Sequence, residues 1–357
     1  MKKWISGLAA ALLIVTMSAG CGKTPAAPES AESSEGGVIT LPPVTDTTGT
    51  QAPVLENLNP LTGENDLTQG GTRPVGIMIG NNSTSRPQNG IDKADMYVEI
   101  ETEGGITRIL AVFANAERVP AQLGPIRSAR SPFVTIARAM DIVYVHAGGS
   151  APALETLKKI DIDNINALSY DGSTFWRDEQ LRKSKGLEYS MMVSGTNLKD
   201  RMDRLKIGTT ATRTVPFVFG EEAGGGGQGN TNLQVNVSDS RSVTFLYDAA
   251  TGLYTKGNGK LGDTTTHQAA DGTPIRVSNV VVLYADKVME NDVTCDFKLS
   301  SGSGLLVTGG TSRPMTYTCT ADKLAFQGAD GAELTVSPGK TYICVVNSKL
   351  KSKTVLG

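Results

Sequence analysis

The sequence feature that most constrains the fold is a run of four glycines at 224–227, within the stretch EEAGGGGQGNTN. Glycine has no side chain to pack and loses the most backbone freedom on ordering, so such a run is typical of a flexible linker. Before it, apolar residues recur with both helical and strand spacing; after it, nearly every apolar segment is short and alternating. These patterns predict an α+β or α/β chain, in which a mixed α/β domain is followed by a smaller, mostly antiparallel β domain, a sandwich or a barrel.

The predicted domain boundaries follow from this division. Residues 72–214 form the N-terminal domain, 215–230 a short strand with the glycine-rich linker, and 231–357 the C-terminal β domain. With 357 residues, of which 39% are hydrophobic and 20% charged, the chain has room for two soluble domains. The formal net charge of -2 and the lack of a Lys/Arg block argue against a nucleic-acid partner.

The first 20 residues are typical of a secretory signal. Lys2 and Lys3 precede an almost wholly apolar stretch, 4–19, that is too short for an ordinary spanning helix. Cys21 then follows Ala-Gly, as in the bacterial lipobox, although Ser18 stands where that pattern prefers leucine. The alternative is an ordinary signal peptide with an incidental cysteine. We expect an extracytoplasmic lipoprotein anchored to the bacterial cell membrane by diacylglycerol on Cys21, because two acyl chains give stable attachment.

Residues 21–71 are predicted to be a disordered tether. Pro, Ser, Thr, Gly and Glu dominate its first part, and the segment LENLNPLTGENDLTQGG that ends it is still loop-like. Few of these residues could contribute to a core, so the tether would hold the folded part away from the bilayer.

Two turns within 123–150 predict an anion-binding site. In the first, Arg127 and Arg130 lead into Ser-Pro and a helical pattern; in the second, an apolar strand ends at His146 and a Gly-Gly-Ser turn opens another helix, capped by Ser150. Helix N-termini offer unpaired amides to anions, and guanidinium groups add bidentate donors. We therefore expect Arg127, Arg130 and His146 to converge on one open cleft. Alternatively, the arginines neutralise nearby carboxylates and His146 is a hydrogen-bonded structural residue.

An acidic strand, DMYVEIETE, lies upstream of these turns, and Gly104-Gly105 predicts a two-residue hairpin to the strand ITRILAVF. That turn would pair Glu101 with Arg108 across the strands. Glu99, Glu101 and Glu103 would share one face of the strand. In a functional interpretation they orient the arginines or bind a cation. In a structural interpretation they form a solvated face with a stabilising ion pair. No metal is predicted, because no Asp-rich loop with EF-hand spacing occurs.

An aromatic pair followed by two charges occurs further along, at Phe175-Trp176-Arg177-Asp178. These residues could form the wall of a site, with Asp178 orienting the Arg177 guanidinium. They could equally be a core contact with a surface ion pair.

Several strings of the chain resemble the YerB-type lipoprotein family of bacteria: RPVGIMIGNN, RPQNGIDKADMYVE, EGGITRILAVF, GPIRSAR, YVHAGGS and FWRD. The resemblance runs from about Arg73 to the C-terminus. It implies an N-terminal domain and a smaller C-terminal domain behind a lipoprotein signal, and it brings no established activity and no catalytic residues. It marks as members of its signature strings Arg86, Glu103, Arg108, Arg127, Arg130, His146, Trp176, Arg177 and Asp178.

In the predicted β domain, three cysteines lie on strand-like segments. Cys295, Cys319 and Cys344 are expected to be small core residues, although one disulfide among them is the alternative outside the cytoplasm. His267 lies in the polar loop DTTTHQAADG, with no second metal ligand nearby in the sequence.

These observations lead to three functional hypotheses. The leading one is a surface-tethered protein that binds an anionic envelope ligand, such as a wall-polymer or lipid-linked phosphate, without a cofactor. The second is an enzyme on that substrate class, with His146 or Glu103 as acid or base, although no common catalytic motif occurs. The third is a scaffolding lipoprotein that binds a protein partner. The candidate ligand-binding residues are Arg86, Glu101, Glu103, Arg108, Arg127, Ser128, Arg130, His146, Gly148, Gly149, Ser150, Trp176, Arg177 and Asp178.

Overall fold

The computed structural model describes residues 57–67, 71–220, 227–229, 232–262 and 264–357. All of them belong to one unit, Pro53–Gly357. The predicted signal peptide, Cys21 and most of the predicted tether lie outside the described residues. Within the described part, no helix combines the length and the apolar character needed to cross a membrane.

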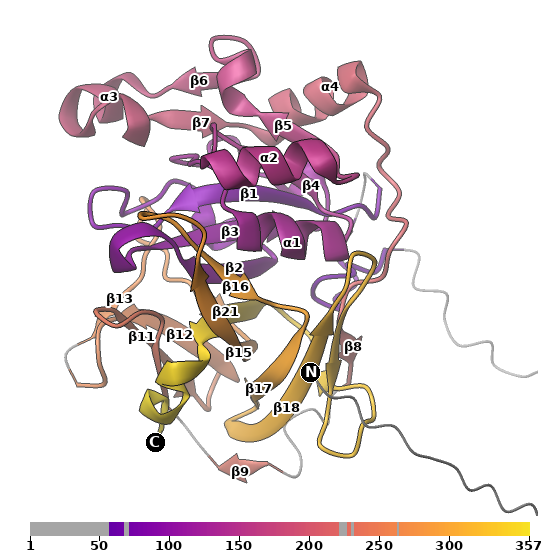
Figure 1. The fold of residues 1–357 in the computed structure, drawn as a ribbon, viewed down its shortest axis with the longest axis vertical. Coiled ribbons are helices and arrows are strands. Elements are labelled where there is room, and N and C mark those ends of the chain that lie inside the picture. The colour runs from indigo at the N-terminus through magenta and orange to yellow at the C-terminus, as the bar shows by residue number, and fades with distance from the viewer. Residues whose placement is uncertain (1–56, 68–70, 221–226, 230–231, 263) are drawn as a thin grey trace, which may run out of the picture. The chain divides into compact units, whose positions relative to one another are not determined.

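The main sheet contains strands from both sides of the glycine run (Figure 1). Its hydrogen-bonded order is β19-β18-β17-β15-β21-β2-β3-β1-β4-β5, while β16 pairs with β15 and β9 pairs with β18. In that order the strands are β19 (Leu324–Gln327), β18 (Thr311–Cys319), β17 (Ser301–Thr308), β15 (Asn279–Met289), β21 (Thr341–Asn347), β2 (Met96–Glu101), β3 (Thr107–Phe113), β1 (Val75–Gly80), β4 (Val143–His146) and β5 (Asn164–Asn166), with β16 (Cys295–Lys298) and β9 (Gln228–Gly229).

The seam between the two halves of this sheet is the parallel pair β2–β21, which runs from Met96 opposite Thr341 to Ile100 opposite Val345. Each residue in this pairing is buried, so the seam lies inside the protein. The α/β character of the first half and the mostly antiparallel character of the second are confirmed, and the structure adds that the halves share one sheet. The predicted boundary at 215–230 remains a prediction.

One face of the sheet is covered by helices. These are α1 (Ser131–Ala139) and α2 (Ala151–Lys159). Helix α4 (Gly195–Leu205) instead contributes Leu198 and Met202 to the core on the opposite face, and α3 (Glu179–Lys185) has no buried residue. Phe133, Ile136 and Ala137 of α1 are buried together with Val98 of β2, as their helical spacing predicts. The two-stranded sheet of β6 (Phe175–Arg177) and β7 (Met191–Val193) lies in the same half of the chain.

A second sheet packs on the opposite face. Its order is β13-β12-β11-β10-β22, and β14 pairs with β12. Phe245 of this sheet meets Tyr342 of β21 edge-on, with ring centroids 5.1 Å apart. These strands are β10 (Asn232–Asn236), β11 (Ser242–Asp248), β12 (Leu253–Asn258), β13 (Thr265–Thr266), β14 (Arg276–Val277) and β22 (Val355–Leu356); β8 (Val218–Phe219) pairs separately with β20 (Thr335–Val336).

The end of the predicted tether is part of the fold. Leu61 and Leu67 are buried in the core beneath the main sheet. The Asn59 amide donates to the Asp95 carboxylate at 3.2 Å, and both side chains are buried. The prediction of a disordered tether for 21–71 is therefore wrong for residues 57–67. Their mostly polar composition suggested a loop, but the two buried leucines attach this stretch to the core.

The predicted hairpin register at Gly104-Gly105 is wrong by one residue. Glu101 lies opposite Thr107, and Arg108 lies opposite Ile100. The reason is a longer loop: Thr102 N donates to Ile106 O at 2.8 Å around a 3-10 turn, in which both glycines have positive φ. The Glu101–Arg108 pair therefore does not form, and Glu103 lies in the turn instead of on the strand.

The acidic strand is not solvated either. Glu99 and Glu101 are both buried. Glu101 accepts from Lys287 of β15 at 2.6 Å, which places its ion pair in the other half of the chain. The three cysteines are buried and free, as expected of core residues.

Candidate functional site

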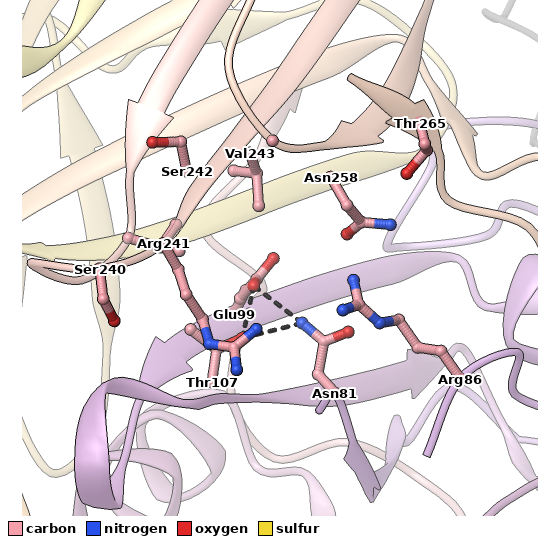
Figure 2. A pocket seen from close by; sticks show the side chains of 12 residues that line it. Asn81, Arg86, Glu99, Thr107, Ser240, Arg241, Ser242, Val243, Asn258 and Thr265 are labelled. Carbon is pink, nitrogen blue, oxygen red and sulfur yellow. Dashed lines mark hydrogen bonds between the residues drawn. The ribbon is translucent and has the colours of Figure 1, made fainter. Parts of the chain in front are cut away.

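A polar cavity lies where the ends of β1, β2 and β3 meet the second sheet. We call it the seam cavity; its volume is about 340 Å³. Figure 2 shows that its lining residues come from both halves of the chain. The lining residues are Asn81, Arg86, Glu99, Thr107, Val237, Ser240, Arg241, Ser242, Val243, Asn258, Gly259 and Thr265.

The floor of the seam cavity is the buried Glu99 carboxylate. Its Oε1 accepts from Asn81 Nδ2 at 2.8 Å and from Thr107 Oγ1 at 2.7 Å, and its Oε2 accepts from the Tyr342 hydroxyl at 2.6 Å. Lys256 Nζ lies 3.6 Å from the same Oε2. A buried charge needs such partners, and here it has four. The carboxylate therefore needs no further cation from the cavity.

A chain of buried hydrogen bonds continues from Lys256 across the two halves. Lys256 Nζ lies 3.0 Å from His267 Nδ1, and His267 Nε2 lies 2.9 Å from Gln88 Oε1. Burial lowers the pKa of His267 well below its usual value, and the charges of Lys256 and Arg86 lower it further. A neutral ring that accepts at Nδ1 and donates at Nε2 satisfies both contacts.

Two guanidinium groups line the cavity with their donors unused. Among the residues that the structure describes, neither Arg86 nor Arg241 makes a side-chain hydrogen bond or ion pair. Both groups point into the cavity, one on each side of the Asn81 amide (Figure 2). Guanidinium groups pair preferentially with carboxylates or phosphates, so two half-buried ones without an anion indicate a place for one.

The electrostatics of Arg86 reflect this arrangement. Burial lowers the pKa of Arg86, Glu99 opposes that effect, and the positive charge of Arg241 lowers it further. A bound anion would offset both unfavourable effects, because an opposite charge at short range favours the charged form.

Two other candidate arginines, Arg108 and Arg130, lie outside this cavity, and their guanidiniums are already paired. Both arginines bind the Glu103 carboxylate, Arg108 at 2.6 Å and Arg130 at 2.7 and 2.8 Å, and we call these three residues the sealed cluster. Each arginine also donates from Nη1 to a backbone carbonyl, Arg108 to Ser128 O and Arg130 to Ala129 O. Burial, and after it the charge of Arg130, lowers the pKa of Arg108 to about 9. For Arg130, the structure matches the sequence alternative in which the arginine neutralises a nearby carboxylate.

His146 is closed as well. Its side chain is buried, its Nδ1 lies 2.7 Å from Gly148 O, and its Nε2 lies 3.3 Å from Asn164 Oδ1. Burial lowers its pKa. The structural alternative for His146 therefore fits better than the catalytic one, since both ring nitrogens are occupied and no substrate reaches them.

The Gly148-Gly149-Ser150 turn does cap α2, with Ser150 Oγ accepting from Ala153 N at 3.4 Å. Two of its three amides already have acceptors within the protein, because Gly148 N donates to Asn166 Oδ1 and Ser150 N donates to Ala129 O. The expected convergence of Arg127, Arg130 and His146 on one cleft is thus wrong: Arg130 and His146 turn into the protein, towards their own partners.

Arg127, Ser128 and Arg177 line a separate hollow of about 440 Å³. There Arg127 pairs with the exposed Glu188 at 2.9 Å, and Arg177 pairs with Asp171 at 2.9 Å. Asp178 does not orient Arg177. It caps α3 instead, accepting from Leu181 N at 2.8 Å, because a short carboxylate directly before a helix satisfies its first amides. Trp176 is partly buried on β6, opposite Met192.

No group of three or more His, Cys, Asp or Glu side chains with metal-binding geometry occurs in the described ranges. The seam cavity accordingly offers guanidinium, amide and hydroxyl groups, together with one carboxylate whose oxygens already accept hydrogen bonds.

Two family models match the chain. The model "Protein of unknown function (DUF3048) N-terminal domain" matches residues 61–208, and "Protein of unknown function (DUF3048) C-terminal domain" matches residues 233–343. The chain belongs to the DUF3048 family. The matches end and begin on either side of the glycine run, and the seam cavity takes lining residues from both DUF3048 domains.

The chain is also similar to a protein and to a solved structure from Bacillus subtilis. "Putative lipoprotein YerB" from Bacillus subtilis (strain 168) is 30% identical over 299 residues, which are 80% of this chain and 85% of that protein. The crystal structure of YerB protein from Bacillus subtilis is 29% identical and has a TM-score of 0.71; the match covers 84% of this chain and 98% of that chain. The resemblance to the YerB-type family that the sequence indicates is confirmed, and so is the fold class.

Sequence reasoning identified Arg86 but missed the residues of the second half of the chain that lie in and behind the seam cavity. Arg241, Lys256 and His267 lie more than 150 residues further along the chain, and no local motif links them to Glu99. One signal was present: strand alternation places Lys256 on the same face as Tyr254, and an aromatic residue on that face favours its burial.

Proposed function

We propose that this protein is a membrane-anchored extracytoplasmic lipoprotein that binds an anionic envelope ligand in the seam cavity. The anchor is inferred from the lipobox-like sequence before Cys21 and from the similarity to the putative lipoprotein YerB. The ligand site is inferred from one observation: the Arg86 and Arg241 guanidiniums line a polar cavity, and neither has a protein partner among the described residues.

Charge supports an anion as the ligand. Glu99 is the one acidic side chain among the described lining residues, and its charge is balanced by the Lys256 ammonium, 3.6 Å away. The two guanidiniums remain as surplus positive charge. Around them, Asn81, Asn258 and Thr265 provide amide and hydroxyl groups that can donate to an anion or accept from its hydroxyls.

The geometry supports binding more than catalysis. A general acid or base must be within reach of the reacting group and be able to exchange a proton with it. Both oxygens of Glu99 already accept hydrogen bonds from neutral donors, so this carboxylate serves as a fixed acceptor for the cavity wall.

The test is calorimetric titration of the full chain, in detergent, with inorganic phosphate and with glycerol 3-phosphate. We expect Arg86→Gln and Arg241→Gln each to weaken binding at least about tenfold, because a charge-assisted hydrogen bond contributes about 1.5–3 kcal/mol. Arg204→Gln, on the exposed side of α4, is the matched control and should bind as the native chain does.

Two results would overturn the binding proposal: no heat from either probe, or equal affinity in the arginine variants and the native chain. The anchor is tested separately. Incorporation of labelled palmitate should be lost in Cys21→Ser, and its persistence there would contradict the lipoprotein assignment.

A further inference from the structure

A second polar hollow adjoins the seam cavity. Its volume is about 370 Å³, and we call it the Thr266 hollow. The two hollows meet at three side chains that line both: Arg86, Asn258 and Thr265. Each hollow alone is near the lower limit of a small-molecule site, so a ligand that occupies both must be elongated.

Arg86 is held at this junction by its backbone. Lys185 Nζ donates to Arg86 O at 3.1 Å, and Arg86 N donates to Asn82 O at 3.3 Å. The Asn82 side chain accepts from Ser85 N at 2.9 Å and fixes the same turn. These bonds fix the backbone from which the guanidinium extends into the junction of the two hollows, so binding there need not order this turn.

The lining of the Thr266 hollow is suited to hydroxyl groups. Ser83, Thr266 and Gln268 offer hydroxyl and amide groups, and Arg86 is the one permanent charge among its described lining residues. Neither hollow has a Phe, Tyr or Trp among the described residues that line it. Flat rings such as nucleobases are usually bound by stacking on such side chains, so the lining favours a flexible, hydroxylated ligand.

We infer that the ligand is a chain of polyol units joined by phosphodiesters, with one phosphate between Arg86 and Arg241 and the next unit in the Thr266 hollow. This inference rests on the proposed function of the seam cavity and specifies its ligand. The two guanidiniums supply bidentate donors for the phosphate, and the hydroxyl and amide groups on either side bind the polyol.

The experiment compares glycerol 3-phosphate with a synthetic glycerol phosphate trimer, titrated into the full chain. The trimer should bind at least tenfold more tightly than the monomer. In Thr266→Trp, whose indole would fill the second hollow, the ratio of the two affinities should fall towards one. Ser83→Tyr should have the same effect if the tryptophan variant folds poorly, whereas Thr210→Trp, an exposed position outside both hollows, should preserve the ratio.

Failure here is distinguishable from failure of the proposed function. If both probes bind equally, and both depend on Arg86 and Arg241, the cavity binds a compact anion and the extended ligand is wrong. If a trinucleotide binds more tightly than the polyol trimer, the ligand class is wrong. If neither phosphate probe binds, the proposed function itself is overturned.

Discussion

The sealed cluster and the seam cavity contain the same ingredients, a glutamate and two arginines, in opposite arrangements. In the sealed cluster, Glu103 binds both guanidiniums directly, and each guanidinium also donates to a backbone carbonyl. In the seam cavity, neutral donors and Lys256 satisfy Glu99, and the two arginines remain without a partner among the described residues.

The difference lies in which group neutralises the carboxylate. Direct pairing completes a site internally, and the arginines then stabilise the fold. When other donors satisfy the carboxylate, the positive charges of the two guanidiniums are not neutralised. This charge lowers the stability of the fold and provides affinity for an anion from outside the protein. The presence of arginines in a sequence string is therefore not enough to assign it to ligand binding. What matters is whether a carboxylate of the protein already neutralises them.

The largest effect should come from the sealed cluster. Glu103→Gln removes the carboxylate that holds Arg108 and Arg130, whose side chains are 4% and 9% exposed. We expect a loss of about 3 kcal/mol in the free energy of unfolding by urea, near the lower end for a broken buried pair because Glu103 is itself 23% exposed.

Glu188→Gln is the matched control, because it also removes an arginine's carboxylate partner. Glu188 is 64% exposed, so its pair with Arg127 should contribute no more than about 0.5 kcal/mol. If the two variants lose equal stability, burial does not distinguish the sealed cluster from a surface ion pair, and the comparison drawn above fails.

A smaller effect should appear in the pH dependence of stability, and it probes the hydrogen-bond chain behind the seam cavity. Because the folded-state pKa of His267 lies well below its usual value, the unfolded chain binds more protons as the pH falls below about 6.5. Stability should therefore decrease with acidification, by about 1 kcal/mol for this residue between pH 7 and 5.5.

His267→Gln should remove this contribution while its amide can still meet Lys256 and Gln88. The chain contains two histidines, and His146 shifts in the same direction, so part of the slope should remain in the variant. Urea unfolding at several pH values measures both slopes. An unchanged slope in His267→Gln would mean that the ring is protonated in the folded chain.

The parts of the fold that the sequence predicted are those with local signals. The helical spacing of Phe133, Ile136 and Ala137, the cap at Ser150 and the alternation in β11 and β12 all specify their own structure. The hairpin register at Gly104-Gly105 failed because a turn of two or of five residues fits the same glycines, and a one-residue slip changes every cross-strand partner.

The candidate site was predictable only in part, for a different reason. Arg86 belongs to a recognisable string, but its cavity depends on β2 pairing with β21, whose residues are more than 200 positions apart. The hydrophobic pattern of β21 predicts a buried strand without indicating its neighbour. A single sequence cannot therefore bring Arg241 or Lys256 to Glu99, and the anion site was assigned to arginines that lay close together in the chain instead.

The smallest expected effect gives the sharpest test of the contrast. Arg241→Ala removes a guanidinium with no protein partner among the described residues and relieves its repulsion of Arg86, so unfolding free energy should change by less than about 0.5 kcal/mol. Arg130→Ala removes the equivalent group from the sealed cluster and should cost several times more, because it leaves Glu103 with one cation fewer. Urea unfolding of the two variants in phosphate-free buffer compares them directly. A loss in Arg241→Ala as large as that in Arg130→Ala would show that Arg241 stabilises the fold, and the argument that its charge is reserved for a ligand would no longer hold.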